Sequence, residues 1–196
     1  MTTIGFVRHG ITEWNVQKRV QGTTDIPLND TGKQQAEAAG ERLTLEEPWD
    51  LIISSDLGRA SETASIIGEK LGVPIDHKEQ RIRELNCGEI EGTTEEERVE
   101  KWGPNWRELD LGMDSYESIG KRGLAYIEEL ATTYGGKRVL VVSHGGFIGL
   151  TMRYLLPEMQ HTNIGNTSVT VIEKREKGWS CSLYNCSKHL DAVEAN

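Results

Sequence analysis

The sequence predicts an α/β fold, a three-layer sandwich in which helices cover both faces of a mostly parallel central sheet. Short apolar runs alternate with longer stretches whose apolar residues recur at helical spacing. The clearest strands are residues 4–7, 51–53 and 139–142, and the last is apolar throughout, as a central parallel strand should be. Alternating strands and helices with short connections are typical of this class. With 196 residues, we expect one domain over residues 1–196.

The helices are predicted over residues 31–45, from after Asp56 to 71, over 114–134, and from after Gly146 to 155. Thr31 with Gln34, and Asp114 with Glu117, have capping-box spacing, which predicts where the first and third helices begin. The inner face of the third helix is expected to carry Tyr116, Ile119, Gly123, Ile127 and Leu130.

The remaining segments give weaker patterns. Residues 168–173 and 179–184 predict a terminal hairpin, and residues 187–196 are expected to be loosely held. Residues 86–113 show no clear periodicity, although 95–97 suit a solvated helical face. Trp102 and Trp106 lie four residues apart, which fits either core packing or a lid over a pocket.

Composition excludes several classes of partner. The net charge is −9, from 22 basic and 31 acidic residues, which argues against nucleic-acid and anionic-membrane binding. No apolar run approaches the roughly 18 residues of a spanning helix, and the first residues lack the pattern of a signal peptide. Three cysteines without a Cys-x-x-Cys pair make a disulfide framework and a zinc site improbable. We therefore expect a cytoplasmic protein, and a homodimer is compatible with the sequence.

Polar side chains follow each predicted strand. The first strand leads into Arg8 and His9, the second into a Ser-Ser-Asp stretch and Arg59, and the third into His144. In open α/β sheets, ligands bind in the crevice beyond the carboxyl ends of the strands. If the three strands are parallel neighbours, two histidines and two arginines converge there.

Such a cluster suits a phosphate monoester. Planar guanidiniums match phosphate oxygens, and two of them balance a dianion of about −2. Two helices are predicted to begin nearby, where their N-termini attract anions, and Gly145 allows close backbone approach to a ligand. We expect no metal, because an arginine beside the ligand works against a divalent cation and no His-x-x-x-His or Asp-x-Asp spacing is present.

The ordered motifs resemble the histidine phosphatase superfamily, the phosphoglycerate-mutase-like proteins, and most of all its short bacterial phosphatases. They span residues 4 to about 150. The motifs are Arg8-His9-Gly10, Thr12-Glu13-Trp14-Asn15, Gln21-Gly22, Asp25-Ile26-Pro27-Leu28, Thr31-Gly32-x-x-Gln35-Ala36, Ser54-Ser55-Asp56-Leu57-x-Arg59-Ala60-x-x-Thr63-Ala64, Glu84-Leu85, Gly88-x-x-Glu91-Gly92 and Ser143-His144-Gly145-Gly146.

The resemblance implies a phosphatase that hydrolyses a small phosphorylated metabolite without a cofactor. His9 would attack phosphorus and form a phosphohistidine, which water then hydrolyses. Arg8, Arg59 and His144 would hold the phosphoryl oxygens. Glu84 would act as general acid and base, so it should sit in a partly desolvated place. The resemblance also implies that Asn15, Gln21, Gly22 and Gly145 contact the substrate.

Some alternatives stay open. Arg59 could pair with Glu62 on a helix surface, and Asn15 could simply cap a turn. The residues alone do not choose Glu84 over Glu79, Glu89 or Glu91; the resemblance does. A phosphoglycerate mutase is the second hypothesis, although residues 84–114 look too short for the inserted segment of the mutases. A non-catalytic binder of phosphorylated ligands is the third.

Overall fold

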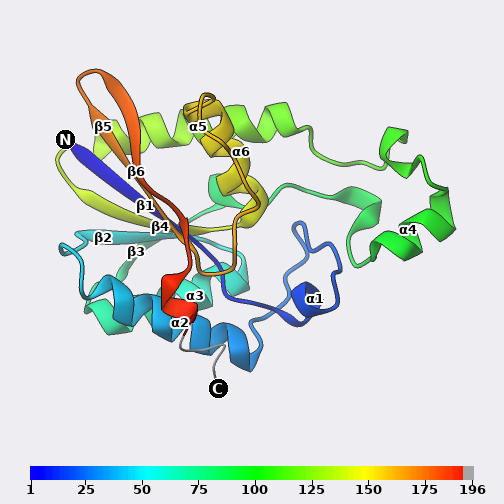
Figure 1. Cartoon of the computed structure of the whole chain (residues 1–196), viewed down its shortest axis with the longest axis horizontal. Coiled ribbons are helices and arrows are strands. Elements are labelled where there is room, and N and C mark those ends of the chain that lie inside the picture. The colour runs from blue at the N-terminus through cyan, green and yellow to red at the C-terminus, as the bar shows by residue number, and fades with distance from the viewer. Residues whose placement is uncertain (192–196) are drawn as a thin grey trace.

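The computed structural model describes residues 1–191 and confirms the α/β class, with a six-stranded sheet between helices (Figure 1). The strands are β1 (Thr2–Arg8), β2 (Leu51–Ser55), β3 (Ile75–Glu79), β4 (Arg138–Ser143), β5 (Val169–Arg175) and β6 (Gly178–Cys186). The helices are α1 (Glu13–Val16), α2 (Asp30–Leu43), α3 (Gly58–Leu71), α4 (Glu95–Trp102), α5 (Tyr116–Thr133) and α6 (Gly145–Leu155).

The sheet is parallel over its first four strands. Its order is β3-β2-β4-β1-β5-β6, with β5 antiparallel to β1 and β6 antiparallel to β5. In Figure 1, α5 and α6 cover one face and α2 and α3 cover the other. This arrangement confirms the three predicted layers and makes β1, β4 and β2 parallel neighbours.

The core explains why β4 is apolar throughout. Val139 and Val141 pack with α5 and α6, whereas Leu140 and Val142 pack with α2 and α3. All four are fully buried. Because successive residues of a strand point to opposite faces, a strand covered on both sides needs an apolar residue at every position.

The predicted beginnings of two helices are wrong by one to two residues. The N-cap of α2 is Asn29, whose side chain accepts a hydrogen bond from the Gly32 amide, and that of α5 is Ser115. A capping residue has extended backbone and precedes the first helical residue, whereas Thr31 already lies inside α2. Asp114 instead accepts a hydrogen bond from the Asn86 amide.

Two further expectations are corrected at exposed positions. Strand β3 was not predicted, because its sequence Ile-Asp-His-Lys-Glu is mostly polar and exposed. It forms through backbone pairing with β2 at the sheet edge, which leaves little apolar signal. Tyr116 was placed on the inner face of α5, but it is 62% exposed because it lies at the first position of the helix.

Residues 86–113 form a lobe beside the sheet, with α4 at its far end in Figure 1. Trp106 is 5% exposed and packs with Cys87, Ile90 and Leu111 in a small separate core. Trp106 is therefore a core residue of this lobe, while Trp102 lies partly buried against it.

The end of the described chain is held more firmly than expected. Residues 188–190 form a 3₁₀ turn, Leu190 is buried, and His189 contacts Arg42 of α2 and Thr167. The loose packing expected of 187–196 is therefore wrong for this turn, and residues 192–196 lie outside the described part. Across residues 1–191 we find no helix with the length and apolarity needed to span a membrane.

Candidate active site

The structure brings the four predicted side chains together at the carboxyl end of the sheet. Arg8 ends β1, His9 follows it, and His144 joins β4 to α6. Arg59 lies in the first turn of α3, and its Nε is 3.3 Å from His9 Nε2. The ring centres of His9 and His144 are 5.3 Å apart. The convergence follows from topology, because β1, β4 and β2 are parallel neighbours.

His9 is held as a neutral imidazole. Its Nδ1 lies 2.7 Å from the Gly10 carbonyl oxygen, which can only accept, so Nδ1 carries the proton. Nε2 then keeps its lone pair and accepts a hydrogen bond from Arg59 Nε. Burial, together with the charges of Arg8 and Arg59, lowers the pKa of His9 well below its usual value. Nε2 is therefore unprotonated at neutral pH, and its lone pair can attack once the hydrogen bond from Arg59 is released.

Arg59 is buried inside the site. It is 1% exposed, and it donates hydrogen bonds to the carbonyl oxygens of Gly22 (2.7 Å) and Thr24 (2.8 Å). Glu62, the alternative partner, instead pairs with Lys33 at 3.5 Å. The reading of Arg59 as a helix-surface residue is therefore wrong. Its guanidinium links the loop at residues 21–24 to His9.

Glu91 fixes that loop from the other side. Its carboxylate accepts hydrogen bonds from the backbone amides of Thr23, Thr24 and Cys87 and from both threonine hydroxyls. Burial alone would raise the pKa of Glu91, but these hydrogen bonds outweigh it and the pKa is lowered. Gly22 has φ of +52°, and a Cβ there would lie 2.0 Å from the Glu91 carboxylate, so only glycine fits.

Arg8 and His144 each present a buried nitrogen without a partner among the described residues, Arg8 Nε and His144 Nδ1. Arg8 Nη1 donates to the Ile164 carbonyl oxygen at 2.7 Å, and His144 Nε2 lies 2.8 Å from Ser55 Oγ. Burial and the nearby arginines lower the pKa of His144 well below its usual value. Unpaired polar atoms beside two guanidiniums suit an anionic ligand, because buried polar groups are otherwise costly.

The structure separates Glu84 from its rivals. Glu84 is half-buried and accepts hydrogen bonds from the amides of Gly146 (3.0 Å) and Phe147 (2.9 Å) at the start of α6. Glu79 pairs with Arg81, Glu89 is exposed, and Glu91 is engaged by the loop at 21–24. Among these four carboxylates, only that of Glu84 lines the cavity beside Arg8.

Asn15 and Gln21 lie beside the cluster with their side-chain oxygens engaged. Asn15 Oδ1 accepts from the Thr12 amide at 3.1 Å and completes the capping box of α1, as the turn-capping alternative expected. Gln21 Oε1 accepts from Thr12 Oγ1 at 2.9 Å. Asn166 Nδ2 donates to the His9 carbonyl oxygen and lies 3.3 Å from Asn15 Oδ1. The side chains of Asn15 and Asn166 therefore hold the backbone around His9, whereas that of Gln21 is held by the Thr12 hydroxyl.

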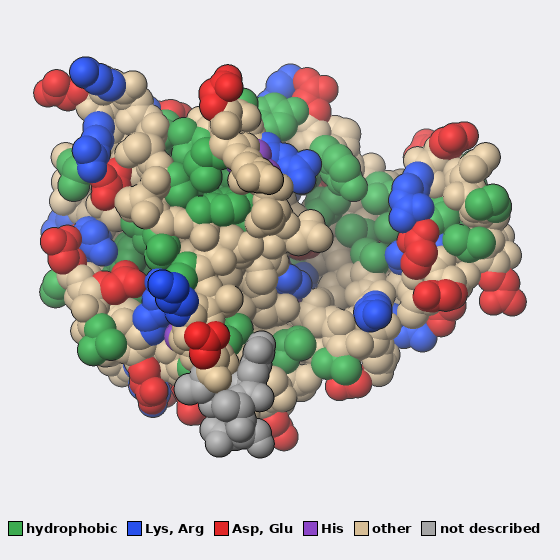
Figure 2. All heavy atoms as spheres, viewed as in Figure 1, with side chains coloured by type: hydrophobic (Ala, Val, Ile, Leu, Met, Phe, Trp, Pro, Cys, Tyr) green, Lys and Arg blue, Asp and Glu red, His purple; other side chains and the backbone are tan. Residues whose placement is uncertain are grey.

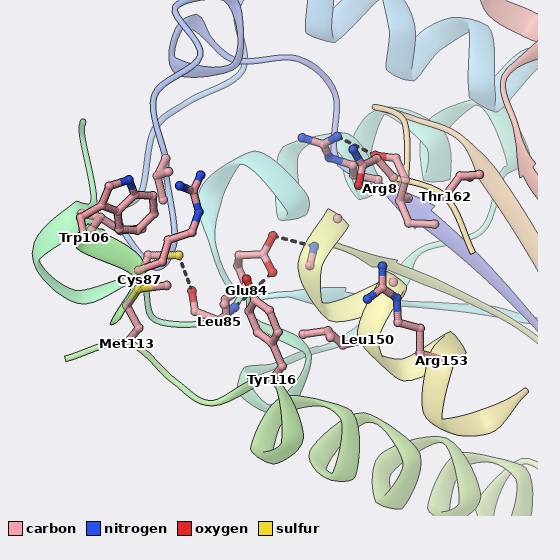
Figure 3. Close-up of a pocket in the computed structure, with 18 residues that line it drawn as sticks. Arg8, Glu84, Leu85, Cys87, Trp106, Met113, Tyr116, Leu150, Arg153 and Thr162 are labelled. Atoms are coloured by element: carbon pink, nitrogen blue, oxygen red, sulfur yellow. Dashed lines mark hydrogen bonds between the residues drawn. The ribbon is translucent and has the colours of Figure 1, made fainter. Parts of the chain in front are cut away.

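A cavity of about 590 Å³ opens from this cluster. In Figure 3, Glu84 lies in its middle, between Arg8 on one side and Trp106 on the other. Figure 2 shows the molecule hollowed between the sheet and the lobe of residues 86–113. Arg107, Arg153 and Tyr116 are polar side chains of the outer cavity. Its apolar lining comprises Val20, Leu85, Ile90, Trp106, Met113, Leu150 and Ile164.

Several supporting residues were not recognised from the sequence. Ser55 contacts His144, and Thr63 Oγ1 accepts a hydrogen bond from the Gly10 amide at 3.0 Å. The Thr167 amide donates to the Arg8 carbonyl oxygen at 2.9 Å. Ser55 and Thr63 fall inside a motif that the sequence shows, so motif position is a usable signal for these two residues.

Comparison with known proteins places this geometry in a family. The model of the histidine phosphatase superfamily (branch 1) matches residues 4–187. The uncharacterized phosphatase PhoE of Bacillus subtilis is 37% identical over 97% of both chains. A metal-independent phosphoserine phosphatase of Arabidopsis thaliana is 31% identical over 98% of this chain and 85% of that protein.

A solved structure agrees with these sequence relatives. It is a mutant phosphoserine phosphatase from Entamoeba histolytica in complex with phosphoserine, with a TM-score of 0.81 and 29% identity over 97% of this chain and 100% of that chain. The fold, the site and the relatives agree, and the chain belongs to the histidine phosphatase superfamily, as a phosphatase that hydrolyses phosphomonoesters.

Proposed function

We propose that this protein is a metal-independent phosphatase that hydrolyses a small phosphomonoester through a phosphohistidine on His9. The observation that carries the proposal is the state of His9: a buried, neutral imidazole whose Nε2 lone pair faces Arg59 at 3.3 Å. An imidazole of this kind is an activated nucleophile. Two guanidiniums and a second neutral imidazole surround it, which suits the charge of a phosphoryl group.

The reaction has two steps. His9 Nε2 attacks phosphorus, the P–N bond forms as the P–O bond to the alcohol breaks, and Glu84 gives its proton to the departing oxygen. A water molecule then returns a proton to Glu84 while its oxygen attacks phosphorus, so that the P–N bond breaks and inorganic phosphate leaves. Glu84 is suited to both roles because it is half-buried and lines the cavity beside Arg8.

The remaining residues bind and position the phosphoryl group. Arg8 Nε and His144 Nδ1 are buried and unpartnered in the described chain, so a phosphoryl oxygen would satisfy both. For His144, a hydroxyl proton donated by Ser55 to Nε2 would leave the proton on Nδ1. Arg59 supplies positive charge next to Nε2, and the Gly145 backbone allows close approach. We assign Asn15 of α1, together with Gln21 and Gly22 of the loop at residues 21–24, to contacts with the substrate.

Two features support a reaction without a metal or another cofactor. The groups around His9 are cations and neutral imidazoles, and cations disfavour a divalent metal at the same point. The positive charge that stabilises a phosphoryl transition state is supplied by Arg8 and Arg59. The name of the Arabidopsis relative is consistent with this assignment.

The lining of the cavity supports a proposal for the alcohol part of the substrate. Its outer walls carry apolar side chains together with Arg107 and Arg153. We propose a small phosphorylated metabolite whose alcohol has an apolar part.

Cys87, Cys181 and Cys186 are unpaired, which supports a reducing, cytoplasmic location. A homodimer remains a proposal, as does the absence of nucleic-acid and membrane partners.

The decisive experiment traps the intermediate. Wild-type protein is treated with p-nitrophenyl phosphate in EDTA and quenched, and phosphorylated protein is mapped by mass spectrometry under alkaline conditions that preserve phosphohistidine. We expect release of p-nitrophenol and a phosphate on His9. His9→Ala should lose both, whereas His77→Ala, at an exposed histidine of β3, should keep both. Labelling and turnover by the His9→Ala protein would refute the assignment.

The same protein separates the other hypotheses. A phosphoglycerate mutase would interconvert 3- and 2-phosphoglycerate faster than it releases phosphate. A binder would take up inorganic phosphate without turnover of any substrate in a metabolite panel. The open cavity favours hydrolysis, because water can reach a phosphoryl group held at its inner end.

A further inference from the structure

Arg8 owes its orientation to a single peptide group. Arg8 Nη1 donates to the Ile164 carbonyl oxygen at 2.7 Å, and no other hydrogen bond holds this guanidinium within residues 1–191. The loop that carries Ile164 is not part of the sheet. Asn166 and Thr167 tie the end of this loop to the backbone of His9 and Arg8, and the direction of the Ile164 carbonyl depends in addition on what holds the peptide bond between Ile164 and Gly165.

The side chain of Asn185 holds the same peptide group from its other end. Asn185 Oδ1 accepts a hydrogen bond from the Gly165 amide at 2.9 Å. The carbonyl of Ile164 and the amide of Gly165 belong to one planar peptide bond, in which the two groups point in opposite directions. Fixing the amide therefore fixes the carbonyl, and donation by the amide also strengthens the carbonyl as an acceptor.

Two more hydrogen bonds keep the loop in place. Asn185 Nδ2 donates to the Asn163 carbonyl oxygen at 2.8 Å and to Thr162 Oγ1 at 3.1 Å. One side chain thus contacts the loop at three residues, 162, 163 and 165. Thr162 lies on the same side of the cavity as Arg8 in Figure 3, which shows that this loop forms that wall.

A β-bulge directs Asn185 toward the loop. Val171 pairs with Leu183 and Val169 pairs with Cys186, so two residues of β6 stand opposite the single residue Thr170. Asn185 has φ of +47°, in the left-handed region that asparagine adopts more readily than most residues. Bulges next to active sites commonly redirect a side chain in this way. The backbone amide of Asn185 donates a hydrogen bond to Thr170 Oγ1 at 2.9 Å and so stabilises the bulge.

We propose that Asn185 is a positioning residue: through the peptide bond between Ile164 and Gly165, it orients the Arg8 guanidinium for the phosphoryl group. It acts through Arg8 and touches no reacting atom. The inference rests on the proposed role of Arg8 in holding phosphate. It adds a residue of the antiparallel strand β6 to the site.

The test measures binding of inorganic phosphate by calorimetry, which does not depend on turnover. Asn185→Gly keeps the left-handed backbone and removes the three side-chain hydrogen bonds. We expect phosphate affinity to fall about tenfold, the size of one well-placed hydrogen bond to a charged network. Lys18→Gly is the matched control, since Lys18 is an exposed non-glycine residue with φ of +56°. It should leave phosphate affinity unchanged.

A double-mutant cycle separates positioning from a general structural role. Arg8→Lys removes the planar group that Ile164 orients and should itself weaken phosphate binding. In that background, we expect Asn185→Gly to cost less than about twofold, because contacting residues couple whereas independent ones add. The same cycle on kcat/KM for p-nitrophenyl phosphate should give the same pattern. If Asn185→Gly does not fold, Asn185→Asp replaces it with the opposite expectation. Its carboxylate still accepts from the Gly165 amide and loses only the donations to Thr162 and Asn163, so phosphate affinity should stay near that of the wild type, and a tenfold loss would contradict positioning through the peptide bond.

The outcomes are distinct. Multiplication of the two effects, or unchanged phosphate affinity in a folded Asn185→Gly protein, would overturn the role of Asn185 and leave the proposed function intact. Unchanged affinity in Arg8→Lys would overturn the proposed role of Arg8 and this inference together.

Discussion

The two ends of the cavity are built differently. At the inner end, His9, Arg59 and His144 are at most 2% exposed, and each is fixed by a strand end or by hydrogen bonds to backbone. The outer end, which we call the outer wall, is residues 93–115. Its Trp106 and Leu111 form a small core with Cys87 and Ile90, and it takes part in surface ion pairs such as Arg19–Glu97 and Arg107–Glu95.

The two ends differ in how freely their side chains can change. The inner end is constrained by the sheet, so its chemistry is set once the strands are in place. The outer wall touches the sheet little and can change its side chains without disturbing His9. Charge follows the same division: the protein carries −9 overall, yet the inner end gathers Arg8 and Arg59 around two neutral imidazoles. We therefore expect reaction type and substrate choice to reside in different parts of the molecule.

The largest expected effect compares one arginine from each end. Arg59→Ala should lower kcat/KM for p-nitrophenyl phosphate by about 10³-fold, because it removes a preorganised charge at the reacting atoms. Arg107→Ala, in the outer wall, should change it by less than about threefold, because Arg107 is exposed and its ion pair is screened. Steady-state kinetics on proteins with matched circular dichroism provide the measurement. Equal losses would erase the distinction between the two ends.

The second prediction concerns the core of the outer wall. Trp106→Ala should reduce the free energy of unfolding by about 3 kcal/mol, as expected for removal of a buried aromatic side chain. In protein that remains folded, KM should rise while kcat stays within about threefold, since Trp106 lines the cavity away from the nucleophile. Urea unfolding and kinetics measure both. Leu109→Ala, at a residue 48% exposed, is the control and should shift stability by less than about 0.5 kcal/mol. A collapse of kcat would tie the outer wall to chemistry.

The third prediction concerns pH. Burial, with the neighbouring arginines, lowers the pKa values of His9 and His144 below that of an unfolded histidine, so the unfolded chain binds more protons. The contribution of these histidines to the free energy of unfolding should therefore be fully present above about pH 6.5. Below that pH the free energy of unfolding should fall by about 1.4 kcal/mol per pH unit for each neutral imidazole. His189, whose pKa burial lowers to about 4, adds to this loss.

Urea unfolding between pH 4.5 and 7.5 measures that dependence. His9→Asn should flatten the slope below pH 6.5, whereas Arg107→Ala in the outer wall should leave it unchanged. A slope that survives His9→Asn in full would show that His9 does not contribute to the acid sensitivity.

The smallest expected effect belongs to Arg153. Its exposed guanidinium lines the outer cavity, and none of the ion pairs between described residues includes it. Arg153→Ala should lower kcat/KM about threefold for phosphomonoesters that carry a second anionic group, and leave p-nitrophenyl phosphate unaffected, as a single exposed charge contributes little. Paired kinetics with phosphoserine and p-nitrophenyl phosphate test this. A loss on both substrates would place Arg153 in phosphate binding instead.

Hydrophobic patterns in the sequence predicted the central strands and the helices that cover them. They did not predict the edge strand β3, which forms through backbone pairing. The run at 139–142 showed a strand covered on both faces, and it is β4. Strand β3 is polar and exposed at the sheet edge, so no hydrophobic pattern marked it. The beginnings of α2 and α5 shifted to Asn29 and Ser115, because several neighbouring residues could cap and only the backbone selects one.

The site divides in the same way. Arg8, His9, Arg59 and His144 were predicted because each follows a predicted strand. The residues alone left four glutamates open, and the family resemblance chose Glu84. The structure adds the physical reason, because the other three are engaged elsewhere or exposed. Asn185 carried no signal at all, because its function depends on a bulge and on a loop 20 residues away.

The sequence by itself determined the α/β class and the reactive groups at the strand ends, because alternating hydrophobicity and side-chain chemistry are local properties. The tertiary structure decided which carboxylate lines the cavity, how Arg59 reaches His9, and what shapes the outer wall. Those features depend on contacts between segments far apart in the chain, and a linear pattern does not encode the distances between them.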